Sequence, residues 1–191
     1  MAGERIYPDE VAGPFPRPPV SFEDREGRTI EVRAYDTRDR DETGDGGTDR
    51  SAEEFEALVA MYDDFDPSDR AQGIPPGRES RIRDWLDTIL GEDCLNVVAW
   101  DGEGVAGHAV LVPDEDAYEL AIFVYQPYQR AGIGTNLIET LLGYGQENGV
   151  EKVWLTVERW NRPAVGLYEK VGFETSNSES FELEMSLRLT E

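Results

Sequence analysis

The sequence has a single cysteine, a single histidine and only two lysines among its 191 residues. Cys94 alone cannot form an intramolecular disulfide or a cysteine metal cluster, and His108 alone excludes a zinc site built from several histidines. No apolar run approaches the roughly 20 residues that a membrane-spanning helix needs. No apolar segment follows the charged N-terminus, as it would in a signal peptide. We therefore expect a cytoplasmic location and no metal site.

Positive charge is also scarce. The chain has 18 basic and 41 acidic residues, which gives a formal net charge of -23. Apart from Lys152 and Lys170, every basic residue is an arginine. Such a chain repels phosphates, which argues against nucleic-acid partners and anionic membranes. The charge fits either an ordinary solvated surface or adaptation to molar salt, where screening acts over about 3 Å. Scarce lysine with abundant Asp and Glu resembles proteins of halophilic archaea, and we favour that interpretation.

The length suits one domain with a real core. Residues 1–27 are rich in proline, which excludes a helix or a central strand there and predicts an extended arm. The domain proper should then cover residues 28–191.

Apolar periodicity predicts a mixed α/β sheet in that domain. The turn 101–104 between two apolar runs is typical of a hairpin. Strands are expected at about 29–35, 95–100, 105–112, 118–125, 153–157 and 181–189, and helices at about 51–63, 79–90, 132–148 and 162–171.

A glycine-containing turn joins the expected strand 118–125 to the following helix. Gly132 and Gly134 let backbone amides approach a ligand closely. The first amides of a helix have no internal partners, and the helix dipole favours an anion there. This pattern predicts a phosphate or pyrophosphate site, although a tight turn without a ligand would look the same. The third glycine of the dinucleotide fingerprint and the Gly-Lys-Ser/Thr of a P-loop are both absent.

Two motifs make the chain resemble the GNAT superfamily of N-acetyltransferases. The segment Gln129-Arg130-Ala131-Gly132-Ile133-Gly134 matches that family's Q/R-x-x-G-x-G/A signature. Residues 161–173 match its N-x-x-A-x-x-x-Y-x-x-x-G-F block. The resemblance runs from about residue 118 to 174, and the proline-rich arm lies outside it. It implies a mostly antiparallel sheet with splayed fourth and fifth strands, flanked by about four helices.

The resemblance also implies acetyl-coenzyme A as cosubstrate. Its pantetheine arm should pair with backbone near Phe123 and Val124, and the Val124 amide should polarise the thioester carbonyl. Asn161 should contact the pantetheine or nearby backbone, although it also suits a helix N-cap. The loop positions expected to bind the cofactor are Gln129, Arg130, Ala131, Gly132, Ile133, Gly134 and Thr135.

Tyr168 should supply a proton to the departing thiolate. The alternative is an aromatic residue packed on the sheet, and the surrounding motif favours the catalytic role. Glu119 is a candidate general base acting through water, or else a solvent-facing strand residue. Related acetyltransferases of protein N-terminal alanines carry a Glu twelve residues before the tyrosine, where this chain has Thr156. Glu158 is a weaker substitute. His108 we expect to be an ordinary hydrogen-bonded residue.

The resemblance therefore implies direct transfer of an acetyl group to a primary amine in a ternary complex. Alternatives are a protein N-terminal or lysine acetyltransferase and a non-catalytic acyl-coenzyme A-binding regulatory module. The presence of Tyr168 favours an enzyme over the module. The acceptor, whether a small molecule or a peptide, should lie near residues 65–83, whose mixed charge does not identify it. Superfamily members often form homodimers, so a homodimer is a candidate here, and the sequence leaves the oligomeric state open.

Overall fold

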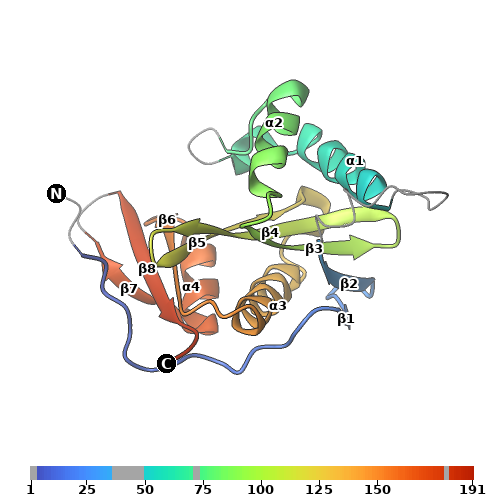
Figure 1. The fold of residues 1–191 in the computed structure, drawn as a ribbon. Coiled ribbons are helices and arrows are strands. Elements are labelled where there is room, and N and C mark those ends of the chain that lie inside the picture. The colour runs from blue at the N-terminus through green and yellow to red at the C-terminus, as the bar shows by residue number, and fades with distance from the viewer. Residues whose placement is uncertain (1–3, 36–49, 71–73, 179–180) are drawn as a thin grey trace.

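The computed structural model describes residues 4–35, 50–70, 74–178 and 181–191, which form one eight-stranded sheet with helices on both faces (Figure 1). Helices α1 (Arg50–Asp63) and α2 (Glu79–Ile89) cover one face. Helices α3 (Ile133–Glu147) and α4 (Arg162–Val171) cover the other. The predicted mixed α/β fold with four helices is confirmed for this part of the chain.

The strands follow the spatial order β1-β2-β3-β4-β5-β6-β8-β7. Six of them match the predicted strands to within a few residues. The two that were not predicted are the edge strands β1 and β7, which have four residues each. Strand β1 lies within the proline-rich arm, and β7 contains no apolar residue. Their bounds are β1 Val20–Glu23, β2 Thr29–Ala34, β3 Leu95–Asp101, β4 Gly104–Asp114, β5 Ala117–Val124, β6 Lys152–Glu158, β7 Glu174–Asn177 and β8 Glu182–Arg188.

Strands β5 and β6 separate along most of their length. They form the one parallel pair of the described sheet, and only Tyr118 with Val153 and Glu119 with Trp154 are in register. Beyond these positions the two strands are no longer paired with each other, although β5 stays paired with β4 and β6 with β8, which confirms the predicted splay. Helix α3 starts a few residues after the free end of β5, and α4 a few residues after that of β6. The opening between the strands therefore lies next to two helix N-termini.

The core consists of two apolar clusters on opposite faces of the sheet. Successive side chains of a strand point to opposite faces, so the free end of β5 contributes to both clusters. Leu120 and Ile122 pack with the cluster beneath α3 and α4. Ala121 and Phe123 pack with the cluster beneath α1 and α2. Each residue of the splayed end therefore faces one helical layer or the other.

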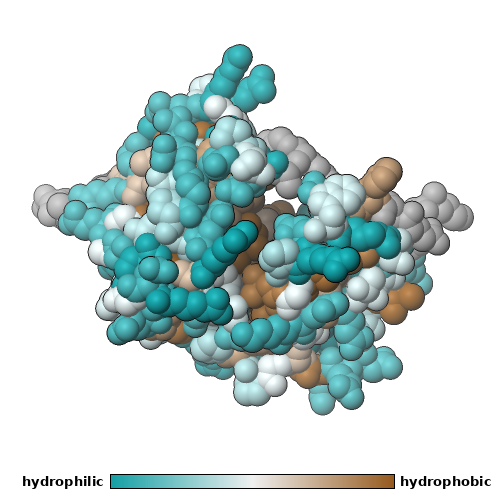
Figure 2. All heavy atoms as spheres, turned by 180° about the vertical axis from the view of Figure 1, so that it is seen from behind, coloured by the Kyte–Doolittle hydropathy of each residue, from teal (hydrophilic) through white to brown (hydrophobic). Residues whose placement is uncertain are grey.

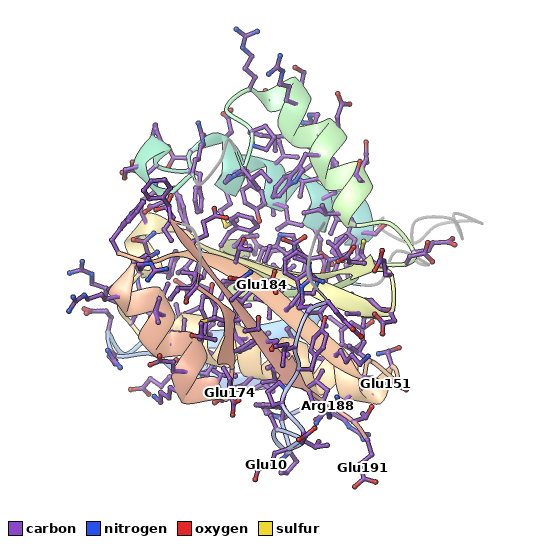
Figure 3. The ribbon with its side chains drawn as sticks, turned by 90° about the vertical axis from the view of Figure 1, so that its left-hand side faces the viewer. Glu10, Glu151, Glu174, Glu184, Arg188 and Glu191 are labelled. Carbon is purple, nitrogen blue, oxygen red and sulfur yellow. The ribbon has the colours of Figure 1, made fainter. Side chains whose placement is uncertain are left out.

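The proline-rich arm runs in extended form along the domain before it enters the sheet as β1 (Figure 1). Near its start, the Arg188 side chain on β8 donates from Nε to the Pro8 carbonyl at 2.8 Å (Figure 3 labels Arg188). Further on, the Pro16 carbonyl occupies the space that a Cβ at Gly143 of α3 would fill. Strand β1 then pairs with β2 at the edge of the sheet, an edge position that proline-rich segments tolerate.

No helix in the described ranges is both long enough and apolar enough to cross a membrane.

His108 lies at the centre of a buried hydrogen-bond chain and is 0% exposed. The Asn96 side chain donates from Nδ2 to the Ile89 carbonyl at 2.8 Å, which leaves its Oδ1 to accept from His108 Nε2–H at 2.7 Å. The other ring nitrogen, Nδ1, then accepts from the Tyr62 hydroxyl at 2.6 Å. His108 is therefore a neutral residue that links β4 to β3 and α1, as expected for an ordinary hydrogen-bonded histidine.

Burial lowers the pKa of His108 to about 3, so the folded protein resists protonating it while the unfolded chain takes up a proton near pH 6.5. Stability must therefore fall as the pH drops below about 6.5. Lowering the pH from 7.5 to 5.0 should therefore lower the free energy of unfolding by about 2 kcal/mol through this residue. Denaturant titrations of the wild type and of His108→Gln measure the difference. Equal pH dependence in the two proteins would contradict this assignment.

Candidate functional site

The loop between β5 and α3 has an unusual backbone. Arg130 and Gly132 both have positive φ values, 60° and 87°. Glycine adopts this conformation freely, whereas a non-glycine residue there is uncommon and often marks a functional site. Gly132 is the N-cap of α3, and in the described structure no side chain caps that helix start. The first amides of α3 are therefore left to attract an anion, with the helix dipole adding to the effect.

A cavity of about 730 Å³ lies against this loop and the splayed strands. Its volume is within the range of small-ligand sites. The face seen in Figure 2 is hollowed, with hydrophobic atoms in the hollow and hydrophilic ones around it. Nine of the residues predicted from the sequence line this cavity: Phe123, Val124, Gln129, Arg130, Gly132, Gly134, Thr135, Asn161 and Tyr168.

Two other predicted loop residues have their side chains in the core instead. Ala131 is 3% exposed and Ile133 is 1% exposed, and both belong to the apolar cluster beneath α3. They can therefore contribute only backbone groups to a ligand. The Ala131 carbonyl accepts a hydrogen bond from the Arg25 amide at 3.0 Å, which fixes the loop against the β1–β2 turn.

The backbone of β5 offers its polar groups alternately to β4 and to the opening. The Tyr125 amide donates to the Ala106 carbonyl at 2.9 Å, and Gly107 is in register with Val124. In an antiparallel ladder the next residue must then point its N–H and C=O away from the partner strand, so Val124 directs them towards the opening. By the same alternation the Phe123 backbone faces β4, and Phe123 contributes to the cavity through its side chain.

The Gln129 side chain connects the end of β5 to the short helix η2 (Pro67–Asp69). Its Nε2 donates to the Val124 carbonyl at 3.0 Å and to Asp69 Oδ2 at 2.9 Å. The segment after α1 is thereby held over the opening. Gln129 also lines the cavity. Its side-chain nitrogen is used in these two hydrogen bonds to the protein, so its observed role is to hold the loop in place.

Tyr168 lies on α4, lines the cavity and is 8% exposed. Its ring contacts Phe173, with centroids 5.9 Å apart, and its hydroxyl has no hydrogen bond to any residue of the described ranges. Burial raises the pKa of Tyr168 to about 12, so the hydroxyl stays protonated at any working pH. Asn161 caps α4, with Oδ1 accepting from the Ala164 amide at 3.4 Å, and it also lines the cavity.

A second cavity, of about 270 Å³, adjoins the first. The two share lining residues that include Asp69, Asn161 and Tyr168. Glu119 lines the second cavity, so it and Tyr168 face the same space. Burial raises the pKa of Glu119, the Asp114 charge raises it further, and Arg5 acts in the opposite direction. A carboxylate with a raised pKa is a better proton acceptor than an ordinary surface glutamate.

Sequence reasoning missed Arg25, which lines the first cavity from the β1–β2 turn. Its Nε lies 3.9 Å from the position that a Cβ on Gly132 would occupy. Neither Arg25 nor Arg130 makes an ion pair with a described residue. No sequence pattern marks Arg25, because it belongs to the arm outside both motifs.

Known proteins resemble the part of the chain that contains the two motifs. The model of the Acetyltransferase (GNAT) family matches residues 58–173. Mycothiol acetyltransferase from Corynebacterium glutamicum is 36% identical over 81 residues, which are 41% of this chain and 28% of that protein. The ribosomal protein bS18-alanine N-acetyltransferase of Escherichia coli is 36% identical over 84 residues, 44% of this chain and 57% of that protein. The chain thus spans about a quarter to just over half of the length of these relatives.

Solved structures share the fold at low sequence identity. The GNAT domain of S. lividans PAT superposes with a TM-score of 0.68 at 16% identity over 90% of this chain and 97% of that one. A putative acetyltransferase from Salmonella typhimurium, yncA, was solved with its cofactor acetyl-CoA. It superposes with a TM-score of 0.61 at 17% identity, over 85% of this chain and 95% of that one. With the family model matching more than half of its residues, the chain belongs to the GNAT acetyltransferase family.

Proposed function

We propose that this protein transfers an acetyl group from acetyl-coenzyme A to a primary amine by direct attack. The observation that carries the proposal is the position of Tyr168, whose unpaired hydroxyl lies where two adjoining cavities meet. One cavity ends at the uncapped start of α3, and the other contains Glu119. Two substrates that enter from the two sides would meet beside this hydroxyl.

The first cavity fits coenzyme A in shape and charge. The free amides of α3 with Arg130 and Arg25 suit a pyrophosphate, which carries negative charge and many acceptor oxygens. Apolar side chains from β5 and α4, such as Ile122 and Leu167, suit the pantetheine arm. The Val124 amide faces the same opening. Bound there, acetyl-coenzyme A would supply an acetyl group activated as a thioester.

Three groups of the chain would then act on the reaction. The amine must be neutral to attack, and Glu119 would accept its proton directly or through water. The Val124 amide would donate to the carbonyl oxygen, where negative charge builds up. A carbon–nitrogen bond forms as the carbon–sulfur bond breaks, and Tyr168 would stabilise the leaving sulfur.

The pKa of Tyr168 decides how it would act. A phenol with a pKa of about 12 is a weaker acid than a thiol with a pKa of about 8.5, so complete transfer of its proton to the thiolate is uphill by roughly 5 kcal/mol. We therefore infer that Tyr168 donates a hydrogen bond to the leaving sulfur and that the final proton comes from solvent.

Replacing Tyr168 with Phe should lower turnover about 10- to 100-fold, because a hydrogen bond to a charged group contributes roughly 1.5–3 kcal/mol. The dissociation constant of acetyl-coenzyme A should change little. Stopped-flow or steady-state assays of thiol release give the first value, and calorimetry gives the second. Tyr118→Phe is the matched control, since Tyr118 lies on β5 outside both cavities. Full turnover in Tyr168→Phe would remove this residue from the chemistry.

Replacing Arg25 with Gln should weaken coenzyme A binding about 3- to 10-fold, because one cation facing the pyrophosphate is lost. The effect should shrink as KCl is raised, since salt screens exposed charges. Arg17→Gln removes the same charge from the arm at an exposed position outside the cavity and should leave binding unchanged. Equal dissociation constants for Arg25→Gln and the wild type at low salt would exclude a phosphate contact.

We further propose that the protein is adapted to high salt, on the strength of its net charge of -23 and its two lysines. Self-repulsion on this scale is relieved when molar salt shortens the screening length to about 3 Å. The free energy of unfolding should therefore rise steeply with KCl between about 0.1 and 2 M. Thermal unfolding across a KCl series tests this, and full stability in dilute buffer would defeat it.

A further inference from the structure

The start of the proline-rich arm is fastened to the sheet face that carries Glu119. The Ser186 hydroxyl on β8 donates to the Ile6 carbonyl at 2.7 Å, and the Arg188 side chain holds the Pro8 carbonyl two residues further along the arm. Ser186 is 1% exposed, so the first of these hydrogen bonds is shielded from water. The residue just before Ile6 is therefore held at a fixed place on the sheet.

Three residues form one row across β5, β6 and β8 on this face. Glu119 is in register with Trp154, and Trp154 is in register with Ser186. Residues in register on neighbouring strands point to the same face of a sheet. The pair of Glu119 and Trp154 is also the last one before β5 and β6 separate. Glu119 therefore lies beside the Trp154 indole at the closed end of the opening.

Arg5 covers this closed end and joins the strands around it. Its guanidinium carbon lies 3.6 Å from the centroid of the Trp154 ring. Its Nη1 lies 3.3 Å from Asp114 Oδ2 on β4, and its Nε lies 3.2 Å from Glu184 Oε1 on β8 (Figure 3 labels Glu184). The Arg5 side chain is 26% exposed, so solvent screens these contacts only in part. One side chain thus links β4, β6 and β8 where β5 and β6 part.

Arg5 also brings positive charge to a carboxylate with acidic neighbours. The titratable groups around Glu119, from the arm, η2, β4, β6, β8 and α4, are Arg5, Asp69, Asp114, Glu158, Glu182 and Tyr168. Of the described lysines and arginines, none lines the cavity of Glu119, and only Arg5 lowers the pKa of Glu119. Lys152 lies further along β6 and is paired with Asp116 at 2.8 Å. Arg5 therefore opposes burial and the Asp114 charge, which both raise this pKa.

We propose that Arg5 is a positioning residue, through which the arm keeps Glu119 ready, as a carboxylate, to accept the proton of the attacking amine. This rests on the proposed function, in which Glu119 is that proton acceptor. Arg5 lines neither cavity, so it acts through Glu119 and Trp154 and not by touching a substrate. The arm, which lies outside both sequence motifs, is thereby a working part of the site.

Replacing Arg5 with Gln should raise the pKa of Glu119, because the cation is lost and Asp114 is left uncompensated. Carboxyl NMR of the full chain with isotope-labelled glutamate, at the lowest KCl that keeps it folded, measures this pKa. The resonance that is missing in Glu119→Gln identifies Glu119. We expect a rise of at least about 0.3 unit, which is a twofold change in proton affinity.

Three further variants separate charge from packing. Arg17→Gln removes the same charge from an exposed position of the arm and should leave the pKa of Glu119 unchanged. Arg5→Lys keeps the charge and should restore most of the wild-type value. Arg5→Met keeps an apolar stem over Trp154, so it carries the test if the Gln variant is unstable. An unchanged pKa without the Arg5 charge, or an equal rise in Arg17→Gln, would overturn the inference.

The pH profile of kcat/KM separates this inference from the proposed function. Thiol release from acetyl-coenzyme A is measured with n-butylamine, phenethylamine and trialanine, whose own ionisation is the same for every variant. The acid limb of the profile should move to higher pH in Arg5→Gln, by as much as the pKa of Glu119.

The possible outcomes then differ. Acetyl transfer with an unmoved acid limb or an unmoved pKa refutes the role of Arg5 and leaves the proposed function standing. A raised pKa of Glu119 without thiol release by any of the three amines supports the action of Arg5 on Glu119 and counts against acetyl transfer.

Discussion

The separation of β5 and β6 is the constraint on which the rest of the site depends. Only two residue pairs join these parallel strands, so beyond them the backbone groups that the two strands direct towards each other are not used in a ladder, although β5 still pairs with β4 and β6 with β8. The Val124 amide faces the opening for that reason, and α4 brings Tyr168 into it. A fully paired sheet would bury those polar groups and close both cavities. The geometry of the candidate site therefore depends on hydrogen bonds that β5 and β6 do not form with each other.

Three segments keep that opening in shape. The Gln129 amide joins the Val124 carbonyl to Asp69, which holds the segment after α1 over the gap. The Arg25 amide binds the Ala131 carbonyl and so braces the glycine loop from the β1–β2 turn. The buried chain through His108 fixes α1 to the sheet beneath. Each contact joins segments far apart in the sequence, so the opening is a product of the whole fold.

The glycine-loop side of the opening differs in charge from the chain as a whole. A chain with a net charge of -23 repels anions in general, yet this side has an uncapped helix start and two arginines without ion pairs to described residues. Local amides and cations act at contact distance, where they outweigh the more distant surface charges, especially when salt screens the latter.

The sequence alone determined the helices, the six longer strands and the two motifs, because apolar periodicity and glycine placement are local properties. It also named Tyr168, Glu119 and the loop residues. It could not find β1 or β7, because four residues are too few to establish a period, nor Arg25, which reaches the loop only through strand pairing. Tertiary structure decided which groups face which cavity. It turned the Phe123 backbone towards β4, buried Ala131 and Ile133, and opposed Glu158 to Glu182 across two strands. Strand register and packing bring together residues that are far apart in the sequence, and a local sequence pattern carries no information about such contacts.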